Sequence, residues 1–252
     1  MTDMPSASRG AVGIVGIPPL NIIAELGKRN VAIHDLDTPL VHEDLETTAP
    51  FVPKVYCAIL RTVVVNALHL QLDAIYIDVG PGKCDSARYI ADVLDSVLAI
   101  PVIRTENRDS RGFGTPVCRS SLSLTEKFLR ITEGVRSATA DCQPPPGEPT
   151  AGFWGVPPRD FSILSLFPDT THVYGWTRCM ENKTPADHGL EAYCNRNVPT
   201  VFFAQSFCAK TALARLLARQ HPRALLLDCD VQAGGSAKAK IQAFLELSGV
   251  YR

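Results

Sequence analysis

The sequence predicts an α/β fold of two similar halves that arose by internal duplication. The motif at residues 13–19, Gly-Ile-Val-Gly-Ile-Pro-Pro, is echoed at residues 152–158 by Gly-Phe-Trp-Gly-Val-Pro-Pro. In each half a short apolar strand then leads to a cysteine and a helix, at Cys84 and at Cys208. A further strand, a Gly-containing loop and a closing helix follow in the same order, which favours a duplication over chance.

The stretch around Cys208 carries the clearest element signals. The run Thr200–Ala204 is rich in Val and Phe and follows a proline, which predicts a buried strand. Leu213, Leu216 and Leu217 recur at helical spacing among Ala, Lys and Arg. Cys208 is therefore expected between the carboxyl end of a strand and the amino end of a helix. Ligands bind at that edge of open α/β sheets, and a helix start favours a thiolate over a thiol.

The first half is expected to alternate strands and helices after a disordered lead-in over residues 1–10. Pro18 and Pro19 suit the first turn of a helix, and Gly27 suits its C-terminal cap. Cys57 is expected in the first turns of a long helix, in the same electrostatic setting as the other two cysteines. The expected strands cover 11–16, 31–34, 72–79 and 100–105, and the helices cover 20–26, 52–70, a segment after Cys84 and a segment with Phe128 and Leu129.

Two loops of the first half invite functional readings. The sequence 80–83, Gly-Pro-Gly-Lys, lacks the spacing and the Ser or Thr of a P-loop, so we read its glycines as room for a bulky group beside Cys84. The run His34-Asp-Leu-Asp37 has the composition of a metal or acid cluster, but acidic residues after a strand are more often solvated loop. The segment 42–53 is acidic and bounded by proline, which indicates a surface loop.

The second half begins after a Pro-rich linker. Residues 143–150 divide an N-terminal domain, 1–142, from a C-terminal domain, 151–252. The expected strands are 153–156, 172–175, 200–204 and 223–228, and the last helix runs through Leu247. The polar segment 176–188 is expected to be a functional loop in which Cys179 and His188 face a cofactor, whereas Cys194 is expected in a helix and Cys229 buried in a strand.

Composition excludes several classes of function. With a net charge of −1, the chain has no excess of positive charge that would favour binding to nucleic acid or to an anionic membrane. The apolar runs are too short to span a bilayer, and the first ten residues lack a secretory signal, so we expect a cytoplasmic protein. Eight cysteines in such a protein favour metal binding or reactive thiols over disulfides. The alternative is that they are small buried hydrophobic residues.

Several short motifs resemble the subunits of 2-hydroxyacyl-CoA dehydratases and benzoyl-CoA reductases. The second half is similar through Phe207-Cys208, the run 225–230 (Leu-Leu-Leu-Asp-Cys-Asp), a Gly-Gly loop, and 241–246 (Ile-Gln-Ala-Phe-Leu-Glu). The first half is similar through Pro18-Pro19, Cys57 ahead of a helix with Arg61, and Cys84-Asp85-Ser86. The chain is shorter than those subunits, has Ala209 where they often have aspartate, and contains no ATP-binding motif.

The resemblance implies two Rossmann-like (flavodoxin-like) α/β domains with a [4Fe-4S] cluster in the cleft between them. Its protein ligands would be Cys57, Cys84 and Cys208, and soft thiolates do select such clusters. The implied activity is that of a lyase or an oxidoreductase: low-potential electron transfer, or reductive or dehydration chemistry on a small substrate. The implied partners are a separate ATP-dependent electron donor and a second copy or a like subunit in a dimer.

Other functions stay open on the sequence alone. The first alternative is a metal-free duplicated α/β binding protein or transferase whose small-molecule ligand occupies the cleft. The second is a hydrolase with a cysteine nucleophile, which needs a base that no histidine spacing identifies. It also stays open whether Cys179, Cys194 or Cys229 replaces one of the three proposed ligands.

Overall fold

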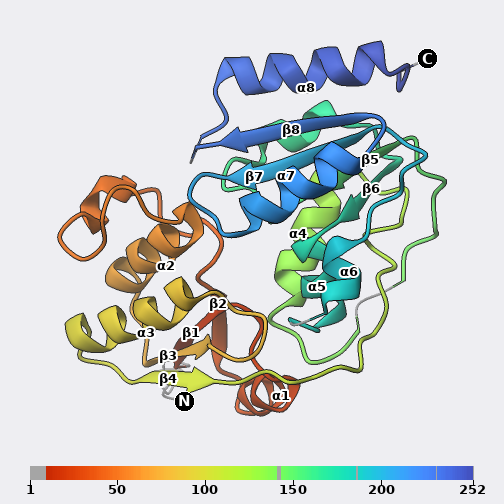
Figure 1. Ribbon diagram of the computed structural model, residues 1–252. Coiled ribbons are helices and arrows are strands. Elements are labelled where there is room, and N and C mark those ends of the chain that lie inside the picture. The colour runs from red at the N-terminus through yellow and green to blue at the C-terminus, as the bar shows by residue number, and fades with distance from the viewer. Residues whose placement is uncertain (1–9, 141–142, 186, 231, 252) are drawn as a thin grey trace, which may run out of the picture.

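The computed structural model describes residues 10–140, 143–185, 187–230 and 232–251, so the expected lead-in at 1–9 lies outside the described residues. The chain forms two four-stranded sheets, and every strand pair in both is parallel. Helices alternate with the strands along the chain (Figure 1). The expected α/β class is therefore confirmed. None of the helices in the described part of the chain combines the length and apolarity that a membrane crossing needs.

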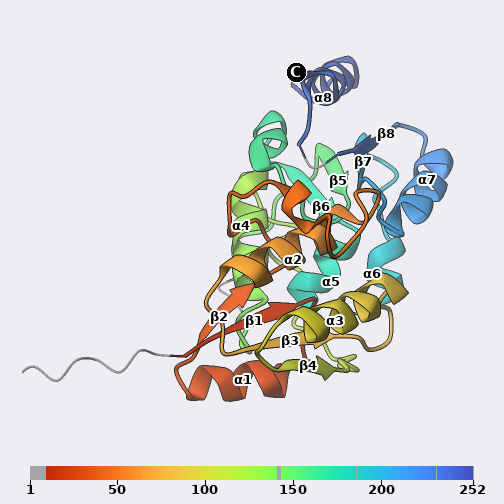
Figure 2. The same cartoon turned by 90° about the vertical axis from the view of Figure 1, so that its left-hand side faces the viewer.

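The first sheet has the strand order β2-β1-β3-β4. Helix α1 lies on one face of this sheet, and α2 and α3 lie on the other (Figure 2). Alternate residues of β1 serve the two faces, since Ile14 joins the core on the α1 side and Val15 joins the core under α2 and α3. Its elements are β1 (Ala11–Val15), α1 (Leu20–Lys28), β2 (Ala32–Asp35), a 3₁₀ turn η1 (Leu45–Thr48), α2 (Ala58–His69), β3 (Ala74–Asp78), α3 (Asp85–Val97) and β4 (Val102–Thr105).

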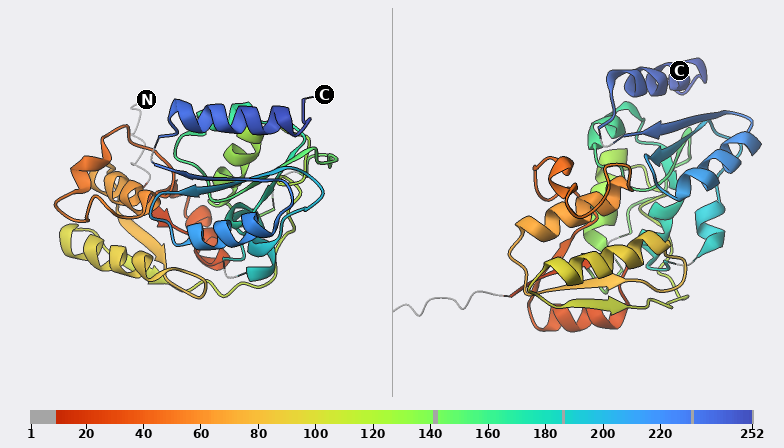
Figure 3. Two further views of the ribbon diagram at one scale, coloured as in Figure 1. Left: turned by 45° about the horizontal axis from the view of Figure 1, so that its top comes forward. Right: turned by 60° about the vertical axis from the view of Figure 1, so that its left-hand side comes forward.

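The second sheet has the order β6-β5-β7-β8, which repeats the order of the first. Strand β7 is buried along its whole length, as its continuous apolar run predicts for an inner parallel strand. Helix α8 lies beyond β8 at one end of the molecule (Figures 1 and 3). The elements are α4 (Leu124–Gly134), β5 (Ala151–Trp154), η2 (Phe161–Leu166), β6 (Thr171–Tyr174), α5 (Trp176–Asn182), α6 (His188–Ala192), β7 (Thr200–Gln205), α7 (Lys210–Gln220), β8 (Ala224–Cys229) and α8 (Gly235–Leu247).

Helix α4 belongs to the first half of the sequence but packs on the second sheet. The ring of Phe128 contacts that of Phe153 edge-on, with the centroids 5.3 Å apart. The buried ammonium of Lys127 donates hydrogen bonds to the carbonyl oxygens of Asp169 and Thr171, at 2.8 and 2.6 Å. These contacts hold α4 against the start of β6. The largest core cluster consequently combines residues of both halves.

Two expected helix boundaries in the first half are wrong. Gly27 lies inside α1 instead of capping it, and the left-handed residue after the helix is Asn30, with φ 55°. The second helix begins at Ala58, not at residue 52, so Val55 is exposed and Cys57 is the N-cap residue. No side chain caps this helix start, which explains why the sequence carries no clear boundary signal there.

The expected polar loop at 176–188 is mostly helix and mostly buried. Helix α5 occupies 176–182, where Thr177 donates to the carbonyl oxygen of Gly155 and Arg178 donates to Thr115. These tertiary hydrogen bonds pair the polar side chains that made the segment resemble a surface loop. Cys194 was expected in a helix but lies beyond the end of α6, while Cys229 is buried in β8 as expected.

Candidate functional site

A cleft of about 770 Å³ lies between the carboxyl ends of the two sheets. On one side it is lined by residues that follow β1, β2 and β3 and by the starts of α2 and α3. On the other side it is lined by Val156 after β5, by Trp176 and Met180 of α5, and by the β7–α7 loop. Strand ends of this kind supply the loops that bind ligands in open parallel sheets, so the cleft is the candidate site.

The three cysteines proposed from the sequence all line this cleft. Cys57 is the N-cap residue of α2, Cys84 is the N-cap residue of α3, and Cys208 lies between β7 and α7. Among the described residues, no three His, Cys, Asp or Glu side chains are grouped so that they could hold a metal ion. None of the seven described cysteines forms a disulfide.

An interaction with the thiol of Cys208 is the largest cause that lowers the pKa of Cys57, to about 7, and the backbone N–H groups of Leu60 and Ile59 at the start of α2 add to the effect. The same interaction, together with burial, raises the pKa of Cys208. Cys84 is exposed at the mouth of the cleft.

The backbone before Cys208 is unusual. Phe207 has φ 63°, a left-handed conformation that a bulky residue rarely adopts, and its side chain is 58% exposed. Ser206 donates both its N–H and its hydroxyl to the carbonyl oxygen of Cys229 and so fixes the turn to β8. Strained residues of this kind cluster at functional sites, and here the strain accompanies the placement of Cys208 on the cleft wall.

Three carboxyl groups and one lysine line the side of the cleft that the first half of the chain forms. Asp35 is 4% exposed and Asp78 is 1% exposed, and burial is the main cause that raises the pKa of both. Asp37 adds its charge to that effect on Asp35, and it accepts a 2.7 Å hydrogen bond from the N–H of Gly16. Lys83 lies 3.3 Å from Asp78 as an ion pair, and burial lowers the pKa of its ammonium.

Trp176 connects the two halves at the base of the cleft. The ammonium of Lys83, from the β3–α3 loop, lies 4.5 Å from the centroid of its ring. The ammonium of Lys210, at the start of α7, lies 4.7 Å from the same ring. Lys210 is also ion-paired with Glu191 of α6. One indole therefore contacts a cation from each half, an arrangement that stabilises both ammonium groups.

The remaining cysteine candidates lie away from the cleft. Cys179 is buried in α5, where its thiol donates to the carbonyl oxygen of Asp187 and burial raises its pKa to about 12. Cys194 lines a separate pocket near His221. Cys179, Cys194 and Cys229 are all absent from the cleft lining, and so is every described histidine, including His188.

The arginines of the 107–119 segment do not reach the cleft either. Arg108 is exposed and pairs with Glu106, at 2.7 Å. Sequence reasoning missed Asp78, Trp176 and Lys210 as cleft residues. The sequence does contain a signal for acidic residues of the cleft. Asp35, Asp78 and Asp228 all lie at or next to the carboxyl end of a strand.

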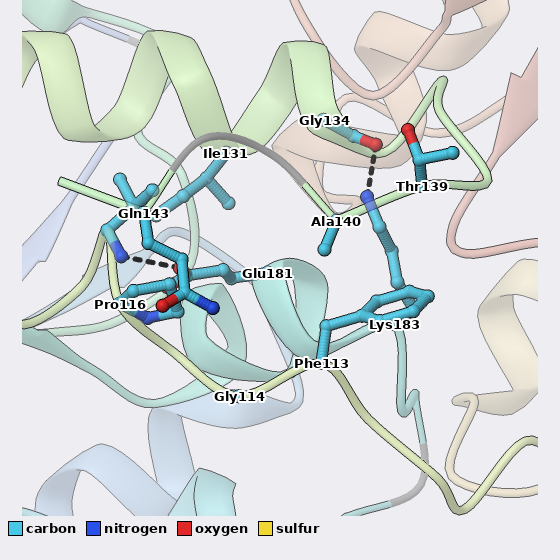
Figure 4. A pocket seen from close by; sticks show the side chains of 11 residues that line it. Phe113, Gly114, Pro116, Ile131, Gly134, Thr139, Ala140, Gln143, Glu181 and Lys183 are labelled. Carbon is cyan, nitrogen blue, oxygen red and sulfur yellow. Dashed lines mark hydrogen bonds between the residues drawn. The ribbon is translucent and has the colours of Figure 1, made fainter.

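A second, smaller pocket lies under α4 and is structural in character (Figure 4). Glu181 of α5 accepts hydrogen bonds from the N–H groups of Val117 and Cys118, at 2.6 and 2.9 Å. Burial raises the pKa of this carboxyl. Lys183 donates to the carbonyl oxygen of Gly134 at the end of α4. Together these bonds attach the 113–118 segment and α4 to α5.

Comparison with known proteins adds little to this geometry. No family model matches the chain, and no curated protein matches it. Among solved structures, the structure of MenH from S. aureus aligns over 98% of this chain and 97% of its own, with 9% sequence identity and a TM-score of 0.21. A similarity this low has no bearing on the fold or the function of the chain.

Proposed function

We propose that the cleft holds an iron–sulfur cluster on Cys57, Cys84 and Cys208, and that the protein resembles 2-hydroxyacyl-CoA dehydratase and benzoyl-CoA reductase subunits in its chemistry. The observation that carries the proposal is that these three cysteines, selected from the sequence, line one cleft at helix starts from both halves. The proposed class is a lyase or oxidoreductase that acts on a small substrate.

The donor set fits a [4Fe-4S] cluster better than a single metal ion. A cluster takes each thiolate on a different iron, so its ligands do not converge on one point as a mononuclear site requires. The lowered pKa of Cys57 favours the thiolate form that iron needs. When bound, such a cluster supplies single electrons at low potential or a Lewis-acidic iron for a substrate oxygen.

The chain's own residues prepare the rest of the cleft for a small ligand. Trp176 and Met180 give it an apolar wall. Lys83 and Lys210 supply ammonium groups at the base, each already held by a carboxylate partner. Asp37 lies close enough to Cys57 to raise the pKa of its thiol by charge repulsion.

We also infer that the two halves are Rossmann-like domains from one duplication, with domains at 1–142 and 151–252 and a linker at 143–150. The repeated strand order and the repeated glycine–proline motif support this inference. Residues 141 and 142, at the proposed boundary, lie outside the described residues. Under this proposal α4 is an exchanged helix that connects one domain to the other. A cytoplasmic location, a dimer and a separate ATP-dependent electron donor complete the proposal.

Iron and acid-labile sulfide per chain, measured on protein purified without oxygen, test the cluster. We expect about four of each and a broad visible absorbance. Serine at Cys57, Cys84 or Cys208 should abolish or sharply reduce the iron content. The matched control is Cys194→Ser, which changes a half-buried cysteine outside the cleft and should leave iron unchanged. A folded wild type that stays colourless after anaerobic reconstitution would refute the proposal.

The second candidate is a metal-free binding protein or transferase with an organic ligand in the same cleft. The observation that favours it is a buried carboxyl oxygen of Asp35 that has no hydrogen-bond partner among the described residues. A polar ligand would supply such a partner. Thermal-shift screening of the colourless protein against small polar metabolite classes tests this candidate, with Trp176→Phe as the variant that should weaken binding.

A further inference from the structure

Another cavity lies beside the cleft, and none of the proposed cluster ligands lines it. Its volume is about 380 Å³, which is within the usual range for small-molecule sites. Asp35 and Thr38 line both cavities, so the two lie next to each other. We call this cavity the side pocket. The lining residues that define it here are His34, Asp35, Leu40, Leu129, Arg136 and Arg159.

Two guanidinium groups line the side pocket without a carboxylate partner. Arg136, which follows α4, donates one hydrogen bond, to the carbonyl oxygen of Ile33 at 3.5 Å. Arg159, which follows β5, donates one to the hydroxyl of Thr62. Within the described residues, neither arginine forms an ion pair. A guanidinium carries five N–H donors, so most donors of both side chains are available to a ligand or to solvent.

Positive charge accumulates around Arg159. Burial is the main cause that lowers the pKa of its guanidinium, and the charge of Arg61 adds to that effect while Asp44 opposes it. Arg61 is itself paired with Glu46, at 3.3 Å. A partly buried cation beside another cation gains from an anion, because the anion offsets the repulsion and accepts hydrogen bonds that are otherwise unmade. The surroundings of Arg159 therefore favour a negatively charged ligand group.

The two acidic residues of the side pocket do not cancel this charge. Glu133 of α4 is exposed, so solvent screens its carboxylate. Asp35 is 4% exposed, and burial and the charge of Asp37 raise the pKa of its carboxyl, with Arg136 opposing them. One oxygen of this carboxyl has no hydrogen-bond partner among the described residues. A protonated carboxyl at this position would donate a hydrogen bond to an anionic ligand.

We propose that the side pocket binds a small organic carboxylate, whose charged group is held by Arg136 and Arg159. Guanidinium groups match the planar carboxylate and bind it through paired N–H···O bonds. Leu40 and Leu129, which are 40% and 46% exposed, would cover the apolar part of the ligand. An inorganic anion such as phosphate would leave these side chains uncovered, so the pocket favours an organic anion. The site contains no cysteine, and its occupancy does not depend on iron.

Ligand-observed NMR on the full-length chain tests the proposal, with phenylacetate as the probe and phenylacetamide as its uncharged counterpart. We expect saturable binding of phenylacetate and binding of the amide that is about tenfold weaker or more, because the amide cannot accept the same charge-assisted hydrogen bonds. Arg136→Gln and Arg159→Gln should each weaken phenylacetate binding by about tenfold or more. The matched control is Arg130→Gln, which removes a guanidinium of α4 that is paired with Glu126 outside the pocket. Its affinity should change by less than about twofold.

Lys210→Gln separates the side pocket from the cleft, because the ammonium of Lys210 lines the cleft alone and its loss should leave phenylacetate binding unchanged. Circular dichroism first establishes that each variant is folded. The inference would be overturned by equal binding of phenylacetate and its amide, by equal weakening in Arg130→Gln and Arg136→Gln, or by loss of binding in Lys210→Gln. Absence of saturable phenylacetate binding would overturn it too. So would inorganic phosphate that binds as tightly as phenylacetate, because the apolar side chains would then contribute nothing.

Discussion

Replacing Gly16 with alanine tests the packing beneath the cleft most directly. Gly16 follows the last residue of β1 and has φ 75°, and a Cβ atom there would lie 2.7 Å from the Nζ atom of Lys83. The left-handed backbone alone costs an alanine roughly 1–2 kcal/mol. Lys83 is 8% exposed and paired with the fully buried carboxylate of Asp78, and breaking a buried pair costs about 3–5 kcal/mol. Because a lysine can shift its end by a few tenths of an ångström, we expect part of that cost and a total of about 2–4 kcal/mol.

Urea unfolding, followed by circular dichroism and by tryptophan fluorescence, measures this change in free energy wherever the two transitions coincide. In a Lys83→Ala background the steric part disappears, and Gly16→Ala should cost only the backbone part, about 1–2 kcal/mol. Gly27→Ala is the matched control: nothing lies within 4 Å of its Cβ position inside α1, and it should stabilise the protein by about 0.5–1 kcal/mol. Equal costs of Gly16→Ala in both backgrounds would refute the reasoning.

Two further changes probe other parts of the structure. Asp35→Asn removes a carboxyl whose pKa burial and Asp37 raise well above its usual range, with Arg136 opposing them. The folded protein keeps a proton there that the unfolded chain releases above about pH 4, so the stability of the wild type relative to Asp35→Asn should fall as pH rises from about 4. Parallel curves of unfolding free energy against pH would contradict this. Glu181→Ala strands two backbone donors and should cost about 3 kcal/mol or more in urea unfolding, with Glu181→Gln costing less.

The strands were predictable from the sequence because their signals are local. Apolar runs bounded by glycine or proline place β1, β3, β7 and β8 within about two residues of their observed bounds. The packing of α4 was not predictable in this way, because the ring of Phe128 would suit the core of either sheet. Only the tertiary structure decides which carbonyl groups accept the hydrogen bonds of Lys127.

The cysteines of the candidate site were predictable for a related reason. All parallel strands of a sheet end on the same edge, so a residue that follows a strand and precedes a helix is directed to that edge wherever the strand lies in the order. This argument identified Cys84 and Cys208. Cys57 was expected inside a helix that began six residues too early; it is the N-cap residue of α2 and lines the same cleft. The strand-end argument contains no information about distance, so the effect of Cys208 on the pKa of Cys57 could not be foreseen.

The same edge argument applies to the acids, and this has a consequence for the chemistry of the cleft. Asp35, Asp78 and Asp228 line the cleft from three strand ends, whereas its two lysines are already paired, Lys83 with Asp78 and Lys210 with Glu191. Carboxyl groups therefore outnumber ammonium groups in the lining around the three cysteines. An anionic ligand would meet repulsion unless a proton or a positively charged group entered with it, since buried charges of one sign oppose each other strongly. Burial and the charge of Asp37 raise the pKa of Asp35, so protonation of this carboxyl would reduce that excess when an anionic ligand binds.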